Sequence, residues 1–130
     1  HLYDARQGHY LGAGRTFDIT LPAQDALVLA VLPYKAGAVT IAAQGAAPGK
    51  PAAVAMRIAT DGKPGLHAFR LEVASPNGKP MPHLSQNVLA ESGQGQTLIP
   101  FALNDPPGDY RISAREVLTG VTAQSVVQVK

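Results

Sequence analysis

The sequence contains no cysteine and no tryptophan, and its few charged residues are nearly balanced in sign. Without cysteine there is no disulfide, thiolate metal site, iron–sulfur cluster or cysteine nucleophile. Charged residues are 15% of the 130 residues, and 11 Lys and Arg against 9 Asp and Glu leave a net charge of +2. Binding to a nucleic acid backbone requires a clustered basic surface, so we expect no nucleic-acid partner.

Long apolar runs are missing as well. The longest, residues 26–33, is far shorter than the roughly 18 to 20 residues that a helix needs to cross a bilayer, so we expect no membrane span. No signal-peptide pattern is present. Because the chain begins at His1 and not at Met, we expect a processed chain or a piece of a larger protein, and the missing signal does not argue against export.

Glycine and proline, 13 and 11 residues, are spread along the whole chain and interrupt any helix long enough for a helical bundle. Short segments instead alternate apolar and polar residues with period two, which predicts strands with one buried face. These segments are residues 17–21, 39–43, 54–58, 69–73, 97–103, 110–114 and 122–129. The continuously apolar run 26–32 predicts a strand covered on both faces, with a short helix after Pro22 as the alternative.

The spacing of these segments, roughly 8 to 12 residues, predicts an all-β, antiparallel, immunoglobulin-like β-sandwich with extra N-terminal strands, with a barrel as the alternative. A change of composition near residues 34–37 divides the chain into an N-terminal β segment, 1–34, and the sandwich, 35–130. The segment 1–34 can complete this sandwich or be the end of a preceding β-domain. Pro100 predicts a sheet edge or a bulge, and residues 83–91 fit a short strand, a helical turn or an irregular crossover.

Turn chemistry marks several connections. Asn77-Gly78 and Thr119-Gly120 predict tight turns. The loop Asn104-Asp105-Pro106-Pro107-Gly108 ends regular structure, and Gly108-x-Tyr110 resembles the tyrosine corner of Greek-key sandwiches, in which the phenol bonds an upstream backbone carbonyl. Asn104, Asp105 and Asp109 offer oxygen ligands to calcium, but two prolines make a rigid turn the simpler interpretation.

Two stretches resemble known families. Residues 1–33, with Tyr3-Asp4-Ala5-Arg6 and Tyr10-Leu11-Gly12, resemble the closing strands of the β-rich C-terminal regions of large bacterial glycoside hydrolases of the β-galactosidase-like kind. From His67 onward the chain is similar to the immunoglobulin-like modules that follow such regions and to macroglobulin-type domains, through Phe69-Arg70-Leu71-Glu72-Val73, Pro76-Asn77-Gly78-Lys79, Asn87-Val88-Leu89-Ala90 and 102–110. The absence of a cysteine pair and a core tryptophan departs from antibody-type domains.

The resemblance implies an accessory sandwich at the end of an exported bacterial protein, extracellular or periplasmic, whose catalytic carboxylates lie in a separate barrel. The residues agree in offering no reaction. Glycosidases need two carboxylates roughly 5 to 9.5 Å apart, and the nine acids show no obvious pairing, with Asp4 and Glu116 the hardest to place. The four histidines lack metal-ligand spacing, and His67 shares the parity of a core-facing row. We therefore expect no enzyme, no cofactor and no metal.

Function then depends on binding. Tyr3, Tyr10 and Leu11 have little to do in a sandwich that starts near Val39, so we predict that they dock neighbouring domains of the same polypeptide. A carbohydrate-binding module is the first alternative, through an exposed pair of Tyr3 and Tyr10, although few aromatic residues remain for a stacking platform. A protein-interaction or adhesion domain that pairs through an edge strand near Pro100 is the second.

Overall fold

The computed structural model describes residues 1–21 and 23–130. Its strands form three antiparallel sheets, which confirms the predicted all-β, antiparallel class. The strands are β1 (Leu2–Asp4), β2 (His9–Gly12), β3 (Leu29–Val31), β4 (Ala36–Ala43), β5 (Pro51–Thr60), β6 (His67–Ala74), β7 (Gln86–Ala90), β8 (Gln94–Pro100), β9 (Gly108–Glu116) and β10 (Thr122–Val129). A short 3-10 helix, η1 (Pro82–Leu84), precedes β7, so the segment 83–91 is part helical turn and part strand.

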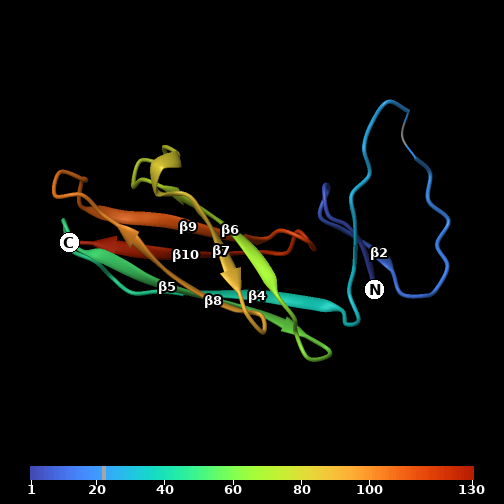
Figure 1. Cartoon of the computed structure of the whole chain (residues 1–130). Helices are drawn as coiled ribbons and strands as arrows, with labels where there is room; N and C mark the ends of the chain where they lie inside the picture. Colours follow the sequence, from blue (N-terminus) through green and yellow to red (C-terminus); the bar gives the residue numbers. More distant parts are fainter. Residues whose placement is uncertain (22) are drawn as a thin grey trace.

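Two of the sheets pack face to face as a sandwich (Figure 1). One has the strand order β10-β9-β6-β7 and the other β4-β5-β8. The predicted alternation is confirmed in the long strands, where Val54, Met56 and Ile58 of β5 are buried while their neighbours in sequence are largely exposed. Strand β6 contributes Phe69 and Leu71 to the same core. Apolar side chains from the two inner faces therefore form one core between the sheets.

Hydrogen bonds connect the two sheets at both side edges of the sandwich. Between β4 and β10, the Ala46 amide donates to the Gln128 carbonyl at 3.0 Å and the Lys130 amide donates to the Ala46 carbonyl at 3.1 Å. On the other side, the Gln86 side-chain amide donates to the Leu98 carbonyl of β8 at 3.2 Å. The strand that carries Pro100 is an edge strand, as predicted, since β8 pairs only with β5.

The third sheet, β2-β1-β3, lies at one end of the sandwich and is drawn in blue in Figure 1. Two predictions for this region are wrong. Residues 17–21 form no strand, and of the apolar run 26–32 only Leu29–Val31 is a strand, with Leu29 and Val31 exposed instead of covered on both faces. Pro22, on which the helical alternative depended, lies outside the described residues. A strand that is apolar on both faces needs other parts of the protein to cover both faces, and residues 29–31 are covered on one face only.

The turns and the loop 104–108 behave as predicted. Gly78 and Gly120 have φ of 81° and 74°, a conformation that glycine adopts without steric cost. Tyr110 is fully buried at the start of β9, and its hydroxyl donates to the Pro106 carbonyl at 2.8 Å, which is the geometry of a tyrosine corner. Burial raises the pKa of the Tyr110 phenol, and the carboxylate of Asp105 adds to the effect.

Candidate docking surface and the polar cluster beneath it

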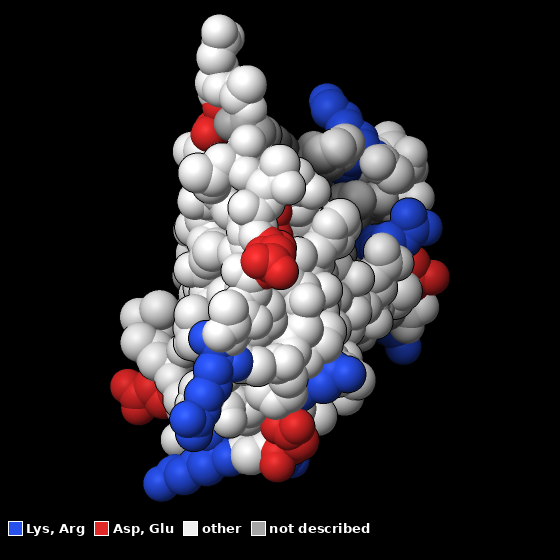
Figure 2. Space-filling model, turned by 90° about the vertical axis from the view of Figure 1, so that its right-hand side faces the viewer, with Lys and Arg blue, Asp and Glu red and all other residues white. Residues whose placement is uncertain are grey.

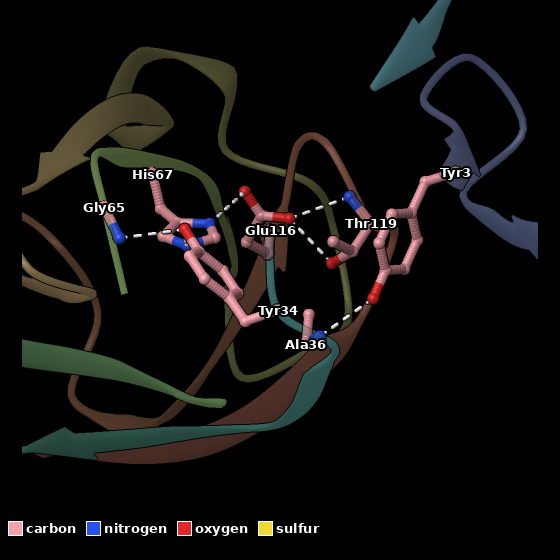
Figure 3. Close-up of polar contacts among 7 residues, drawn as sticks. All are labelled: Tyr3, Tyr34, Ala36, Gly65, His67, Glu116 and Thr119. Atoms are coloured by element: carbon pink, nitrogen blue, oxygen red, sulfur yellow. Dashed lines mark hydrogen bonds and ion pairs between the residues drawn. The ribbon is translucent and has the colours of Figure 1, made fainter. Parts of the chain in front are cut away.

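A chain of buried polar groups lies at the end of the sandwich next to the N-terminal sheet (Figure 3). His67, at the start of β6, places its Nδ1 3.1 Å from Oε1 of Glu116 at the end of β9. The other carboxylate oxygen, Oε2, accepts from the Thr119 amide at 2.7 Å and from the Thr119 hydroxyl at 2.6 Å. On the far side of the ring, Nε2 lies 2.9 Å from the Tyr34 hydroxyl. The side chains of His67 and Glu116 are fully buried, and their hydrogen bonds are made to protein groups.

Hydrogen-bond accounting assigns the protons of this cluster. The Gly65 amide donates to the Tyr34 hydroxyl at 2.8 Å, so that hydroxyl has its own proton left to give to Nε2 of His67. In this arrangement Nε2 accepts from the Tyr34 hydroxyl and Nδ1 donates to Oε1 of Glu116. The carboxylate accepts three hydrogen bonds, and every donor in the cluster has an acceptor. A cluster satisfied in this way holds β6, β9 and the linker between β3 and β4, which contains Tyr34, in one arrangement.

The N-terminal sheet is attached to the sandwich by direct contacts. The Tyr3 hydroxyl accepts from the Ala36 amide at 2.8 Å, inside the protein, and burial raises the pKa of that phenol. The turn after β1 also contacts the turn between β9 and β10. A Cβ built on Gly8 would lie 2.8 Å from the Cα of Gly120, so neither position has room for a side chain. These contacts cross the boundary predicted at residue 34.

The surface of this N-terminal segment is unusually apolar. Seven of the thirteen large hydrophobic residues that are exposed in the described chain belong to its first 31 residues: Tyr10, Leu11, Ile19, Leu21, Val28, Leu29 and Val31. Figure 2 views this end of the molecule and shows broad uncharged surface with scattered charged side chains of both signs. We call these seven residues the N-terminal apolar surface. No other part of the described chain covers these seven apolar side chains, whereas the core side chains are covered by the two sheets.

The predicted docking residues divide between the interior and this surface. Tyr10 and Leu11 are 40% and 44% exposed, whereas Tyr3 is 2% exposed. The prediction of an exposed pair of Tyr3 and Tyr10 is therefore wrong, because Tyr3 points into the core and binds Ala36. The two rings do lie close, with centroids 5.1 Å apart, and the Lys35 ammonium lies 4.9 Å from the centroid of the Tyr10 ring. Only part of one tyrosine ring is left to meet a partner.

The two carboxylates that were hardest to place from the sequence both have structural partners. Asp4 uses Oδ1 to accept from the Arg6 and Gln7 amides, each at 3.0 Å, and so caps the turn after β1. Glu116 holds His67 and Thr119. In the loop after β8, Asp105 accepts from the Ala102 amide at 2.7 Å. Among the described residues no group of three or more His, Asp or Glu is arranged to hold a metal ion.

Sequence reasoning placed His67 in the core correctly but missed Tyr34, Thr119 and the role of Glu116. A signal for Glu116 was present, since it continues the inward parity of Ile112 and Ala114 along β9. An acidic residue at an inward position of a strand needs a buried partner. The sequence does not say which of four histidines supplies it, because that depends on β6 lying beside β9.

In the described part of the chain no helix is long and apolar enough to cross a membrane. Comparison of the sequence with models of known protein families and with curated proteins gives no match.

Proposed function

We propose that the chain is a non-catalytic accessory β-sandwich of a larger, exported, glycoside-hydrolase-like bacterial protein, and that it packs against neighbouring domains of that polypeptide. The N-terminal apolar surface supports the docking role. More than half of the large exposed hydrophobic side chains of the described residues lie in less than a quarter of the sequence. Docking would remove these side chains from water, at roughly 25 cal/mol per Å² of apolar surface.

The attachment of this surface to the sandwich supports the same proposal. A docking element transmits position only if it is held rigidly to the rest of its domain. Here the Tyr3–Ala36 hydrogen bond and the contact between Gly8 and Gly120 hold the N-terminal sheet, and the cluster around Glu116 holds the linker that follows it. The sandwich would therefore act as a spacer with a fixed orientation relative to the domain it meets.

The loop between β2 and β3 also has the features of a segment that a partner covers. Residues 13–28 are a long connection in which the described residues form no helix or strand. Ile19 and Leu21 within it are 38% and 74% exposed. A long loop with exposed apolar side chains is expected where a partner covers it. Figure 1 shows this connection extending away from the sandwich.

The first test is the size of the native polypeptide, by immunoblot of exported and cytosolic fractions with an antibody against this domain. We expect a band several hundred residues or more in size, in the exported fraction. A band near 13.5 kDa contradicts the proposal and favours an independent protein-interaction domain.

The second test locates the docking surface. Hydroxyl-radical footprinting compares the 130-residue chain with the native polypeptide. We expect lower oxidation of Tyr10, Leu11 and Leu21 in the native polypeptide. Leu89 and Leu98, which are 69% and 57% exposed on the sandwich, serve as controls and should be unchanged. Equal protection of all five residues, or protection of the controls alone, would place the interface elsewhere.

A further inference from the structure

The outer edge of β3 is an open strand edge. Strand β3 ends the order β2-β1-β3 and pairs only with β1. The Ala5 amide donates to the Val28 carbonyl at 2.8 Å, and the Leu32 amide donates to the His1 carbonyl at 2.9 Å. Since hydrogen-bonding direction alternates along an antiparallel strand, the backbone groups of the residues between these positions alternate too. Those of Leu29 and Val31 point away from β1 and have no hydrogen-bond partner in the described chain.

Other sheet edges in the described part of the chain carry a contact or a bulge. The sandwich joins β4 to β10 through Ala46 and ties β7 to β8 through the side chain of Gln86. Strand β2, the opposite edge of the N-terminal sheet, has a register shift next to Leu11, and such a bulge twists an edge away from pairing. Strand β3 has no charge, proline or bulge, and its length of three residues is the one protective feature of this edge among the described residues.

The side chains beside this edge are apolar and solvent-exposed. Val28, Leu29 and Val31 are 52%, 40% and 77% exposed. A strand added here would gain main-chain hydrogen bonds from Leu29 and Val31 and would cover the same three side chains. This combination is the recognition mode of strand addition, in which the backbone supplies affinity and alternate side chains supply specificity.

We infer that the open edge of β3 is completed by an extended, apolar strand from a neighbouring domain of the same polypeptide. This inference rests on the proposed function and names the contact through which docking occurs. The extent of the edge decides between occupants. A stable interface between free proteins engages about 20 to 30 residues on each side. The strand offers three residues, and the N-terminal apolar surface to which it belongs offers seven large exposed side chains. A tethered strand needs far less contact, because tethering supplies an effective concentration in the millimolar range.

Hydrogen exchange with mass spectrometry tests the inference on a peptide that spans residues 27–32. In the 130-residue chain we expect rapid exchange of the Leu29 and Val31 amides. In the native polypeptide we expect both to slow by at least about tenfold, because each gains a hydrogen-bond acceptor. Protection of these two amides by self-association of the 130-residue chain, detected by sedimentation at high concentration, would overturn the inference in favour of a second copy.

A matched pair of variants separates the backbone from the side chain. Val31→Pro removes an amide that has no partner in the free chain, so the free chain should keep its fold, as checked by its circular dichroism and melting temperature. In the native polypeptide the same change should restore rapid exchange at Leu29. Val31→Thr keeps the amide and the β-branch and should leave Leu29 protected. If Val31→Pro leaves Leu29 protected, strand addition is refuted.

The inference and the proposed function fail differently. If footprinting shows Tyr10 and Leu11 covered while Leu29 and Val31 still exchange rapidly, docking stands and strand addition is wrong. If the native polypeptide is no larger than this chain, both are wrong.

Discussion

Replacing Gly120 by alanine tests whether the N-terminal hairpin is held against the sandwich. At Gly120, φ is 74°, and a Cβ would lie 2.7 Å from the Gly8 carbonyl oxygen and 2.9 Å from its carbon. The left-handed conformation costs alanine about 1 kcal/mol. Displacing the backbone of Gly8 adds about 1 to 3 kcal/mol, the usual range for overpacking. We therefore expect Gly120→Ala to reduce the free energy of unfolding by about 2 to 4 kcal/mol.

Gly78 provides a matched control. Its φ is 81°, and a Cβ built there would have no atom within 4 Å, so Gly78→Ala carries the conformational cost alone, about 1 kcal/mol. Urea unfolding followed by circular dichroism measures both variants, and the slope with denaturant must be unchanged for the comparison to hold. Amide exchange should also increase in β1 and β3 of Gly120→Ala but not of Gly78→Ala. Equal losses of stability in the two variants would refute the contact between the turns.

Two further predictions concern buried phenols. Tyr34→Phe leaves Nε2 of His67 buried without a partner and should cost about 1 to 3 kcal/mol in urea unfolding. Tyr10→Phe, at an exposed position, should cost less than about 0.5 kcal/mol, and equal losses in the two variants would contradict the satisfied cluster. Stability should also fall as pH rises above about 10, because the phenols of Tyr3 and Tyr110 have raised pKa values in the folded state and the unfolded chain loses these protons first. Urea midpoints between about pH 8 and about pH 11 measure this fall; Tyr3→Phe should make it shallower, and an unchanged pH profile in that variant would count against the buried phenol.

Strand prediction succeeded where a strand has one buried face and failed at the N-terminal end. The alternation of Val54, Met56 and Ile58 coincides with β5, because the opposite sheet covers one face and water covers the other. Residues 17–21 show the same alternation and form no strand. Alternation states which side chains would share a face, but a strand also needs a neighbour with free backbone groups.

The candidate site could be predicted only in part. The sequence indicated that Tyr10 and Leu11 have no place in the sandwich core, and both are exposed. It did not show that Tyr3, in the same sheet, turns inward to bind the Ala36 amide. Adjacent strands place their side chains on two faces, and which face meets the sandwich depends on how the sheet is seated on it.

The sequence by itself determined the class of the fold and its local turns. Scattered glycine and proline excluded long helices, period-two patterning defined one inward face in each long strand, and Tyr110 with its preceding loop predicted a corner that forms as expected. Only the tertiary structure brought His67 beside Glu116, buried Tyr3 and left β3 with an open edge. The physical reason is that propensity and patterning act over a few neighbouring residues, whereas strand order, partner choice and edge exposure depend on residues far apart in the chain.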